Sequence, residues 1–330
     1  MIKEKTVLVL GAGASIPYRF PSGRQLVRDI LNIQANRLYA FLNDIPIHLA
    51  QEFLKELDSA NPLSIDTWLE KNNKFINVGK AAIAHVILKC EDTEELKKNY
   101  ENRYFESLGT DNPLDPNWYQ YLFDRLTREC NNLEQFGDNK LSVITFNYDR
   151  SLEQYLWTSL VSTFTGHGID AYVEQIKKIE IYHIYGSLGP LPLQKAKGPF
   201  VDYGKKTQDQ NTYQLCVNNI NIISDAPSNE QEPVDPYLHA HNLLENAQRV
   251  YFLGFGFHPL NVTRLGLEQL PNYKYDRFDG TALGLPTQDR NTVIDIFVHK
   301  NSRPDPIREN YEILLPPKTC YKFLHEIACL

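Results

Sequence analysis

A glycine-rich segment near the N-terminus has the residue types that hold phosphate groups. It reads GAGAS, from Gly11 to Ser15, and follows an apolar run rich in Val and Leu. Glycines let backbone N–H groups approach a pyrophosphate at the start of a helix, because they carry no side chain. The segment therefore predicts a dinucleotide site, with a strand-to-helix turn that holds no ligand as the alternative.

The same segment departs from the fingerprint of enzymes that transfer hydride. That fingerprint has a third glycine three residues after the second, and an acidic residue about 20 positions further along, at the end of a second strand. Here Ile16 stands at the place of the third glycine, and the region that should hold the acidic residue has a helical pattern. The pattern favours a dinucleotide that does not serve as a redox carrier.

A second segment, TFNYD at residues 145–149, follows another run of apolar residues. In open α/β sheets the carboxyl end of a strand faces the ligand crevice. The amide of Asn147 offers both a donor and an acceptor for ribose hydroxyls or for a water molecule, and Thr145 lies beside it. Asp149 directly precedes a helical pattern, so it is either a site residue or the N-cap of that helix.

A third segment, YHIYGSLG at residues 182–189, contains a histidine at an expected strand end. Side chains two residues apart on a strand share a face, which predicts that His183 and Tyr185 both reach the crevice before the turn at Gly186 and Ser187. A histidine can take a proton from water or from a sugar hydroxyl near neutral pH. We expect His183 as the general base and Tyr185 as the second choice, with a packed core histidine as the alternative.

A fourth segment, FLGFGFHPLN at residues 252–261, ends another apolar run with two glycines. Gly254, Phe255 and Gly256 are expected to flank the adenosine half of a dinucleotide. Glycine after a strand is common, so this segment supports a dinucleotide site only in combination with the other three segments.

The elements that must position these segments alternate between apolar runs and helical patterns. Expected strands lie near residues 5–10, 141–149, 178–189, 212–217, 249–256 and 292–299. This alternation predicts an α/β fold with a Rossmann-like, doubly wound, mostly parallel sheet. A helical insertion, about 25–140, separates the first two strands of a single domain spanning 1–330. Ser22 and Ser64 are expected to cap helices in that insertion.

Composition excludes several classes of protein. The formal net charge of −7 leaves no basic footprint for direct binding of nucleic acid. No apolar stretch approaches the roughly 18 residues of a membrane span, and a strand begins within the first ten residues, which predicts a cytoplasmic protein without a signal peptide. The five cysteines are scattered and form no C-x-x-C pair, so we expect no structural zinc and no metal cofactor.

Together these segments resemble the sirtuin fold, and more specifically the bacterial sirtuin-like NAD+ hydrolases of antiphage defence. The resemblance rests on GAGAS, FPSG at residues 20–23, SIDTWL at residues 64–69, Asn-x-Asp, a histidine-containing strand that ends in Gly-Ser, and the late Gly-x-Gly. It spans about residues 5–300. Two departures stand out: the four-cysteine zinc module of deacylating sirtuins is missing, and Tyr185 stands where the family usually has histidine.

The resemblance implies an NAD+ glycohydrolase that cleaves NAD+ to nicotinamide and ADP-ribose. Such an enzyme would deplete NAD+ during abortive infection once activated by homo-oligomerisation or by a separate subunit, such as an ATPase, an Argonaute-like protein or a nucleotide-binding protein. The alternatives are a deacylase or ADP-ribosyltransferase, a dehydrogenase, and a non-catalytic sensor of NAD+ or ADP-ribose. The expected catalytic residues are Asn147, His183, Asp149 and Tyr185, and the expected NAD+-binding residues are Gly11, Ala12, Gly13, Ala14, Ser15, Phe20, Pro21, Ser22, Thr145, Gly186, Ser187, Gly254, Phe255 and Gly256.

Overall fold

A single parallel sheet organises the chain. The computed structural model describes residues 1–41, 46–97, 117–194, 199–205, 209–222, 236–270, 275–299 and 313–330. Within them, five strands pair in the order β3-β2-β1-β4-β5, all parallel. They are β1 (Thr6–Leu10), β2 (Leu141–Thr145), β3 (Glu180–His183), β4 (Arg249–Leu253) and β5 (Arg277–Gly280). This confirms the expected α/β class, and the strand order is that of Rossmann-like folds.

The strands end at one level. Leu10 pairs with Thr145 on one side and with Leu253 on the other, and Thr145 pairs with His183. The segments that follow β1, β2, β3 and β4 therefore meet at one edge of the sheet. The strand order reverses at β1, which is the point where open α/β sheets form their ligand crevice.

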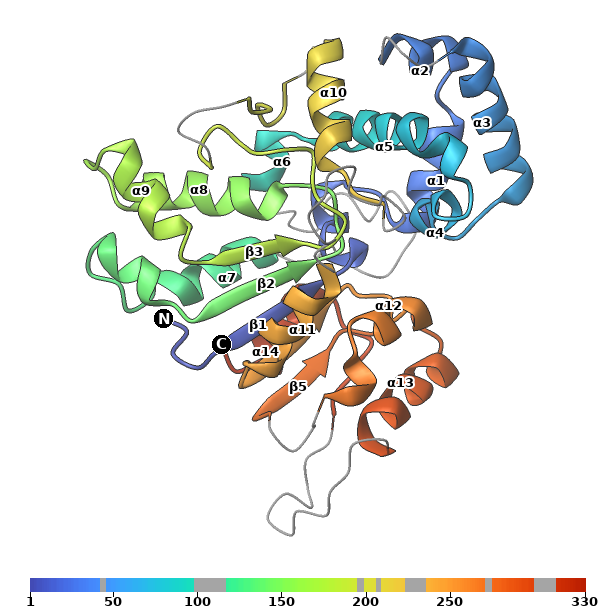
Figure 1. The fold of residues 1–330 in the computed structure, drawn as a ribbon. Helices are drawn as coiled ribbons and strands as arrows, with labels where there is room; N and C mark the ends of the chain where they lie inside the picture. Colours follow the sequence, from blue (N-terminus) through green and yellow to red (C-terminus); the bar gives the residue numbers. More distant parts are fainter. Residues whose placement is uncertain are drawn as a thin grey trace, which may run out of the picture.

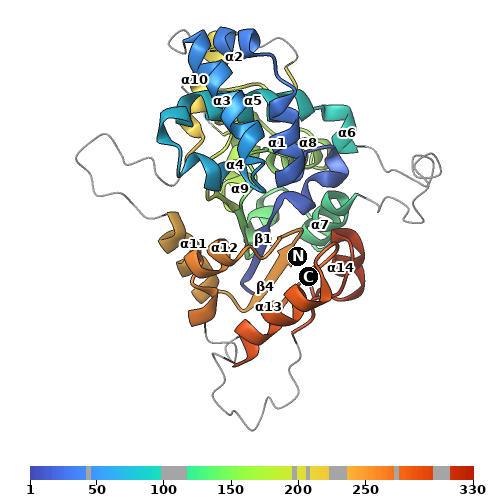
Figure 2. The same cartoon turned by 90° about the vertical axis from the view of Figure 1, so that its right-hand side faces the viewer.

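Helices cover both faces of the sheet and extend beyond its carboxyl edge (Figure 1). Between β1 and β2 the described residues form α1 (Gly23–Leu31), α2 (Ala35–Phe41), α3 (Ile47–Ala60), α4 (Ile65–Leu69), α5 (Ile76–Cys90), α6 (Thr93–Lys97) and α7 (Trp118–Thr127). The later helices are α8 (Ser151–Thr163), α9 (Ile169–Ile176), α10 (Gln210–Asn219), α11 (Pro236–Glu245), α12 (Pro259–Arg264), α13 (Thr287–His299) and α14 (Cys320–Glu326). Figure 1 and Figure 2 show that α1–α5 and α10 gather into one helical layer beyond the carboxyl edge of the sheet.

The sequence explains how this layer forms. Helix α5 is apolar around most of its circumference and is buried from Val78 to Leu88, as expected for a helix that other helices surround. Tyr213 of α10 stacks on Phe41 of α2 at 4.2 Å between ring centroids, and its hydroxyl lies 2.7 Å from Nδ1 of His85 in α5. Helix α1 begins as expected, because Ser22 accepts a hydrogen bond from the Gln25 N–H at 3.3 Å.

Two of the expected strands are wrong. Residues 212–217 lie in α10, where Asp209 caps the helix by accepting from the Thr212 N–H at 2.8 Å, and Tyr213, Cys216 and Val217 are buried at helical spacing. Residues 292–299 lie in α13. The fifth strand is instead β5, whose residues RFDG include an aspartate and a glycine that are uncommon in strands.

None of the helices in the described ranges has both the length and the apolar character that a bilayer crossing requires.

Candidate functional site

A cavity of about 870 Å³ opens at the carboxyl edge of β1, β2 and β4. Its walls come from the turns after these strands, from the start of α1, from α4, and from residues 281–285 and 318–321. Cavities of roughly 300–1,000 Å³ hold small ligands and cofactors. The described lining carries two carboxylates, Asp66 and Asp149, and two cationic side chains, Arg24 and Lys318.

The glycine-rich turns after β1 and β4 are locked together. The Gly13 N–H donates to the Gly254 carbonyl at 3.0 Å. A Cβ atom on Gly11 would lie 2.5 Å from that carbonyl oxygen, and Gly254 itself has a φ of +58°. Both glycines of GAGAS are thus required for the close approach of two backbone turns.

Fewer backbone N–H groups of GAGAS are available to bind phosphate than the sequence suggests. The N–H groups of Gly11, Gly13, Ala14 and Ser15 all donate to carbonyls of the chain. In the described part of the protein, the N–H of Ala12 has no such partner, and Ala12 lines the cavity. Phe20, Pro21 and Ser22 line the same wall of the cavity.

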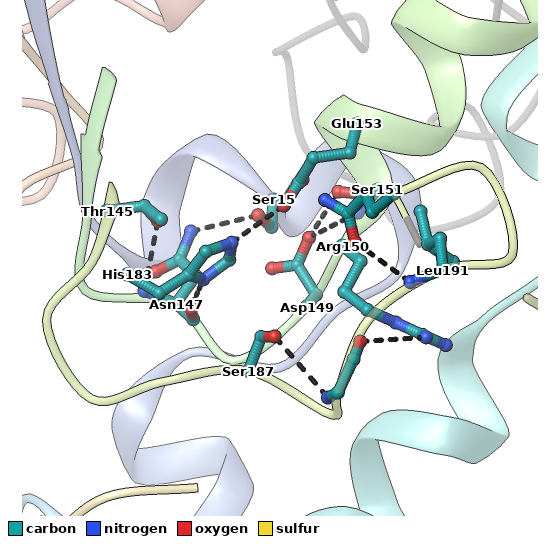
Figure 3. A network of polar contacts seen from close by, with 12 residues as sticks. Ser15, Thr145, Asn147, Asp149, Arg150, Ser151, Glu153, His183, Ser187 and Leu191 are labelled. Carbon is teal, nitrogen blue, oxygen red and sulfur yellow. Dashed lines mark hydrogen bonds and ion pairs between the residues drawn. The ribbon is translucent and has the colours of Figure 1, made fainter. Parts of the chain in front are cut away.

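Asn147 is held in one orientation at the cavity. Its Nδ2 donates to the Gly11 carbonyl and to Ser15 Oγ, both at 3.0 Å, and Figure 3 shows the contact with Ser15. Its own backbone N–H donates to Thr145 Oγ1 at 3.1 Å. Both amide hydrogens are therefore used, and within the described residues Oδ1 has no partner. A ligand hydroxyl can donate to this oxygen.

Asp149 lies at the cavity and precedes Arg150, which is the N-cap residue of α8 in place of the expected Asp149. It lines the cavity with only 6% of its surface exposed. It also stabilises the start of α8, because Oδ1 accepts from the Ser151 N–H at 3.1 Å and from the Ser151 hydroxyl (Figure 3). Burial raises the pKa of Asp149, while hydrogen bonds from Ser151 and Ser15 oppose that rise.

His183 does not line the cavity, contrary to the expected general base. Its Nδ1 lies 2.8 Å from the Asn147 carbonyl oxygen, and its Nε2 lies 2.7 Å from Glu153 Oε1 (Figure 3). Burial lowers the pKa of His183, but Glu153, the Asn147 carbonyl and the charge of Asp149 together raise it above its ordinary value. The ring supports Asn147 from behind and leaves no nitrogen for a ligand.

Tyr185 does reach the cavity, so the expected shared face with His183 is wrong. Strand β3 ends at His183, and the chain then turns at Gly186, whose φ is +64°. The Tyr185 hydroxyl donates to Asn261 Oδ1 and accepts from Tyr237, both at 3.4 Å. Burial raises the pKa of Tyr185, so the phenol keeps its proton near neutral pH.

Four other residues that were expected to contact the ligand, Ala14, Thr145, Gly186 and Ser187, do not line the cavity, because their contacts lie within the protein. Thr145 accepts from the backbone of Asn147, and the Ala14 carbonyl accepts from Trp118 Nε1 at 2.8 Å. Gly186 forms a bridge with Ile220, and Ser187 Oγ accepts from the Gly189 N–H at 3.4 Å. Gly254, Phe255 and Gly256 line the cavity as expected.

The cavity also contains Asp66, whose segment was noted in the sequence only for the resemblance and was given no role. Asp66, in the SIDTWL segment, lies in α4 and lines the cavity. Tyr148 donates to Asp66 Oδ1, and Ser64 donates to Asp66 Oδ2 at 3.0 Å. Tyr148 and Asp66 are 82 residues apart, so no local pattern could have joined them.

Comparison with known proteins assigns neither a family nor a function to the chain. No protein-family model matches the chain, and no curated protein is significantly similar to it. In the described ranges, no group of three or more His, Cys, Asp or Glu side chains is arranged to hold a metal ion.

Proposed function

We propose that the protein binds NAD+ in the cavity and hydrolyses the bond between nicotinamide and ribose. The observation that carries this proposal is the Asn147 amide at the crevice of a Rossmann-like sheet. Gly11 and Ser15 hold its nitrogen, and its oxygen has no partner among the described residues. The sirtuin-like motifs of the sequence support the same reaction. The Ile16 substitution in the glycine fingerprint argues against hydride transfer.

In the proposed reaction, the nicotinamide leaves as a neutral base and needs no acid. The ribose develops oxocarbenium character in the transition state, which nearby carboxylates stabilise. Asn147 Oδ1 accepts from a hydroxyl of the nicotinamide ribose and orients the sugar. Asp149 contributes negative charge, the GAGAS turn lies along the pyrophosphate, and Gly254 and Gly256 flank the adenosine.

A partner or self-assembly is part of the proposal. Unrestrained hydrolysis of NAD+ would harm the cell that makes the enzyme, and the described elements assemble around one sheet without a separate sensor unit. We therefore propose activation by oligomerisation or by another subunit, in keeping with antiphage defence. Purification from the native cell before and after phage infection, followed by mass spectrometry, identifies that subunit.

The reaction is tested by incubating the protein, alone and with co-purified partners, with NAD+ and following nicotinamide by chromatography. Asn147→Ala should lower the rate about 100-fold or more, because orienting and charge-stabilising groups contribute at this scale. Asn36→Ala, on the exposed side of α2, is the matched control. Absence of nicotinamide release from every preparation, or full activity of Asn147→Ala, would overturn the proposal.

A non-catalytic sensor of NAD+ or ADP-ribose is the second candidate. It is favoured by the engagement of both ring nitrogens of His183, the residue expected to be the base. Calorimetric binding of NAD+ without turnover would identify a sensor. Deacylation of an acyl-peptide, or NADH absorbance, would instead identify the remaining alternatives.

A further inference from the structure

We propose that Asp66 is the group that accepts the proton of the attacking water, and that Tyr148 positions its carboxylate. This inference rests on the proposed NAD+ hydrolysis and names the base that His183 does not supply. Asp66 comes from the helical insertion, whereas Asn147 and Tyr148 come from the turn after β2. All three line the same cavity.

The contacts of Asp66 fix its carboxylate and leave room for a ligand. Oδ1 accepts from Tyr148, and Oδ2 accepts from Ser64 at 3.0 Å. Each oxygen of a carboxylate can accept about two hydrogen bonds, so both retain acceptor capacity toward a water molecule. Tyr148 directly follows Asn147, so a single turn orients the ribose through its amide and the base through its phenol.

Three other titratable groups at this edge of the sheet have contacts or roles of their own, and His258, which also lines the cavity, is exposed at the start of α12. His183 uses both ring nitrogens on Asn147 and Glu153. The phenol of Tyr185 keeps its proton because burial raises its pKa. Asp149 accepts from the backbone and hydroxyl of Ser151, which ties it to the start of α8.

Charge and burial suit Asp66 to this step. Burial raises the pKa of Asp66, and hydrogen bonds from Tyr148 and Ser64 oppose that rise. A carboxylate whose pKa is raised is a stronger base than an ordinary carboxylate and therefore a better proton acceptor. Its negative charge also faces a cavity in which the ribose would become positive.

The step balances as a hydrolysis. The water oxygen forms a bond to the ribose C1′, and the bond from C1′ to the nicotinamide nitrogen breaks, with its electron pair going to nicotinamide. The water proton passes to Asp66, which releases it to solvent when ADP-ribose leaves. One NAD+ and one water thus yield nicotinamide, ADP-ribose and one proton.

The test compares Asp66→Asn, Asp66→Glu and Tyr148→Phe in the full chain, with the activating partner where one is needed. Asp66→Asn should lower kcat at least about 100-fold while ADP-ribose binding, measured by calorimetry, changes less than about threefold. Asp66→Glu should restore part of the activity. Tyr148→Phe should lower kcat about tenfold with little change in KM, which is the effect of a positioning residue. Asp58→Asn, exposed on α3, is the matched control.

The outcomes separate this inference from the proposed function. Activity of Asp66→Asn within about threefold of the native protein overturns the role of Asp66 and leaves NAD+ hydrolysis standing. Loss of ADP-ribose binding together with activity assigns Asp66 to binding and also overturns its role as base. A native protein that releases no nicotinamide overturns both.

Where Asp66→Asn melts at lower temperature, Ser64→Ala serves as the second variant, with an expected kcat loss of about three- to tenfold at unchanged ADP-ribose binding. Full activity of Ser64→Ala would then count against the role of Asp66.

Discussion

At the scale of single residues, His183 shows how a buried side chain serves a site it does not touch. It bridges the Asn147 carbonyl and the carboxylate of Glu153, and the side chains of His183 and Glu153 are 11% and 8% exposed. Its protonated form gains an ion pair, whereas the neutral form keeps only hydrogen bonds. The groups that set this balance are Glu153 and, through its charge, Asp149.

This arrangement predicts a pH dependence of stability. The folded pKa of His183 is raised above its ordinary value of 6.5, so the folded state binds the proton more tightly than the unfolded state. The stabilisation is fully present below pH 6.5 and is lost as the pH rises through the raised pKa. Urea denaturation should show the native protein losing its advantage over His183→Gln across that window. An advantage that grows with pH would contradict this assignment.

At the scale of elements, the contact between the turns after β1 and β4 should tolerate no added side chain. Gly254→Ala places a Cβ 2.1 Å from the backbone nitrogen of Ala14, at a φ of +58°. We expect a loss of about 2 kcal/mol or more in the free energy of unfolding, together with weaker ADP-ribose binding.

Gly256→Ala is the matched control for this contact. A Cβ there meets nothing within 4 Å, and the backbone has no positive φ. Its free energy of unfolding should stay within about 0.5 kcal/mol of the native value in the same chemical denaturation. Equal losses in the two variants would show that the locked turns are not what Gly254 provides.

A buried ion pair joins the helical layer to the sheet. Arg150, just before α8, binds Glu91 at the end of α5 with both Nη2 contacts at 2.8 Å, and it also donates to the carbonyls of Gly189 and Val201. Both side chains are at most 1% exposed. Burial raises the pKa of Glu91 to about 7, and Arg150 opposes that rise.

Replacing one partner of this ion pair should lower the folding stability more than replacing both. Arg150→Met leaves Glu91 buried without its partner, which costs about 3–5 kcal/mol of folding free energy. The double variant Arg150→Met, Glu91→Leu should recover part of that loss in urea denaturation. A double variant less stable than Arg150→Met alone would mean that the pair itself stabilises the protein.

At the scale of the whole molecule, the cavity gathers walls from parts of the chain that are far apart. The GAGAS turn, α4, the turn after β2 and residues 318–321 all border it. A ligand that bridges them should stabilise the fold by mass action, by about 2.7 kcal/mol at 100 times its Kd. We expect ADP-ribose to raise the melting temperature in calorimetry, and Asn147→Ala to reduce that rise. An unchanged melting temperature at millimolar ADP-ribose would contradict the assigned cavity.

Local pattern was enough to predict much of this architecture. The runs of Val, Leu and Ile predicted β1, β2 and β4, because strands buried on both faces are apolar at nearly every position. Apolar residues at helical spacing, together with Ser22, predicted α1 for the same local reason. The two wrong strands, at 212–217 and 292–299, are short apolar runs, in which helix and strand are hardest to distinguish.

Only the tertiary structure decided which side chains line the cavity. Asn147 was visible from its place after a strand, but the engagement of His183 depends on Glu153, one turn into the next helix. Asp66 meets Tyr148 only because α4 packs at the carboxyl edge of the sheet. Periodicity and turn chemistry are properties of neighbouring residues, whereas the convergence of four distant segments on one cavity depends on strand order and helix packing, which no local window contains.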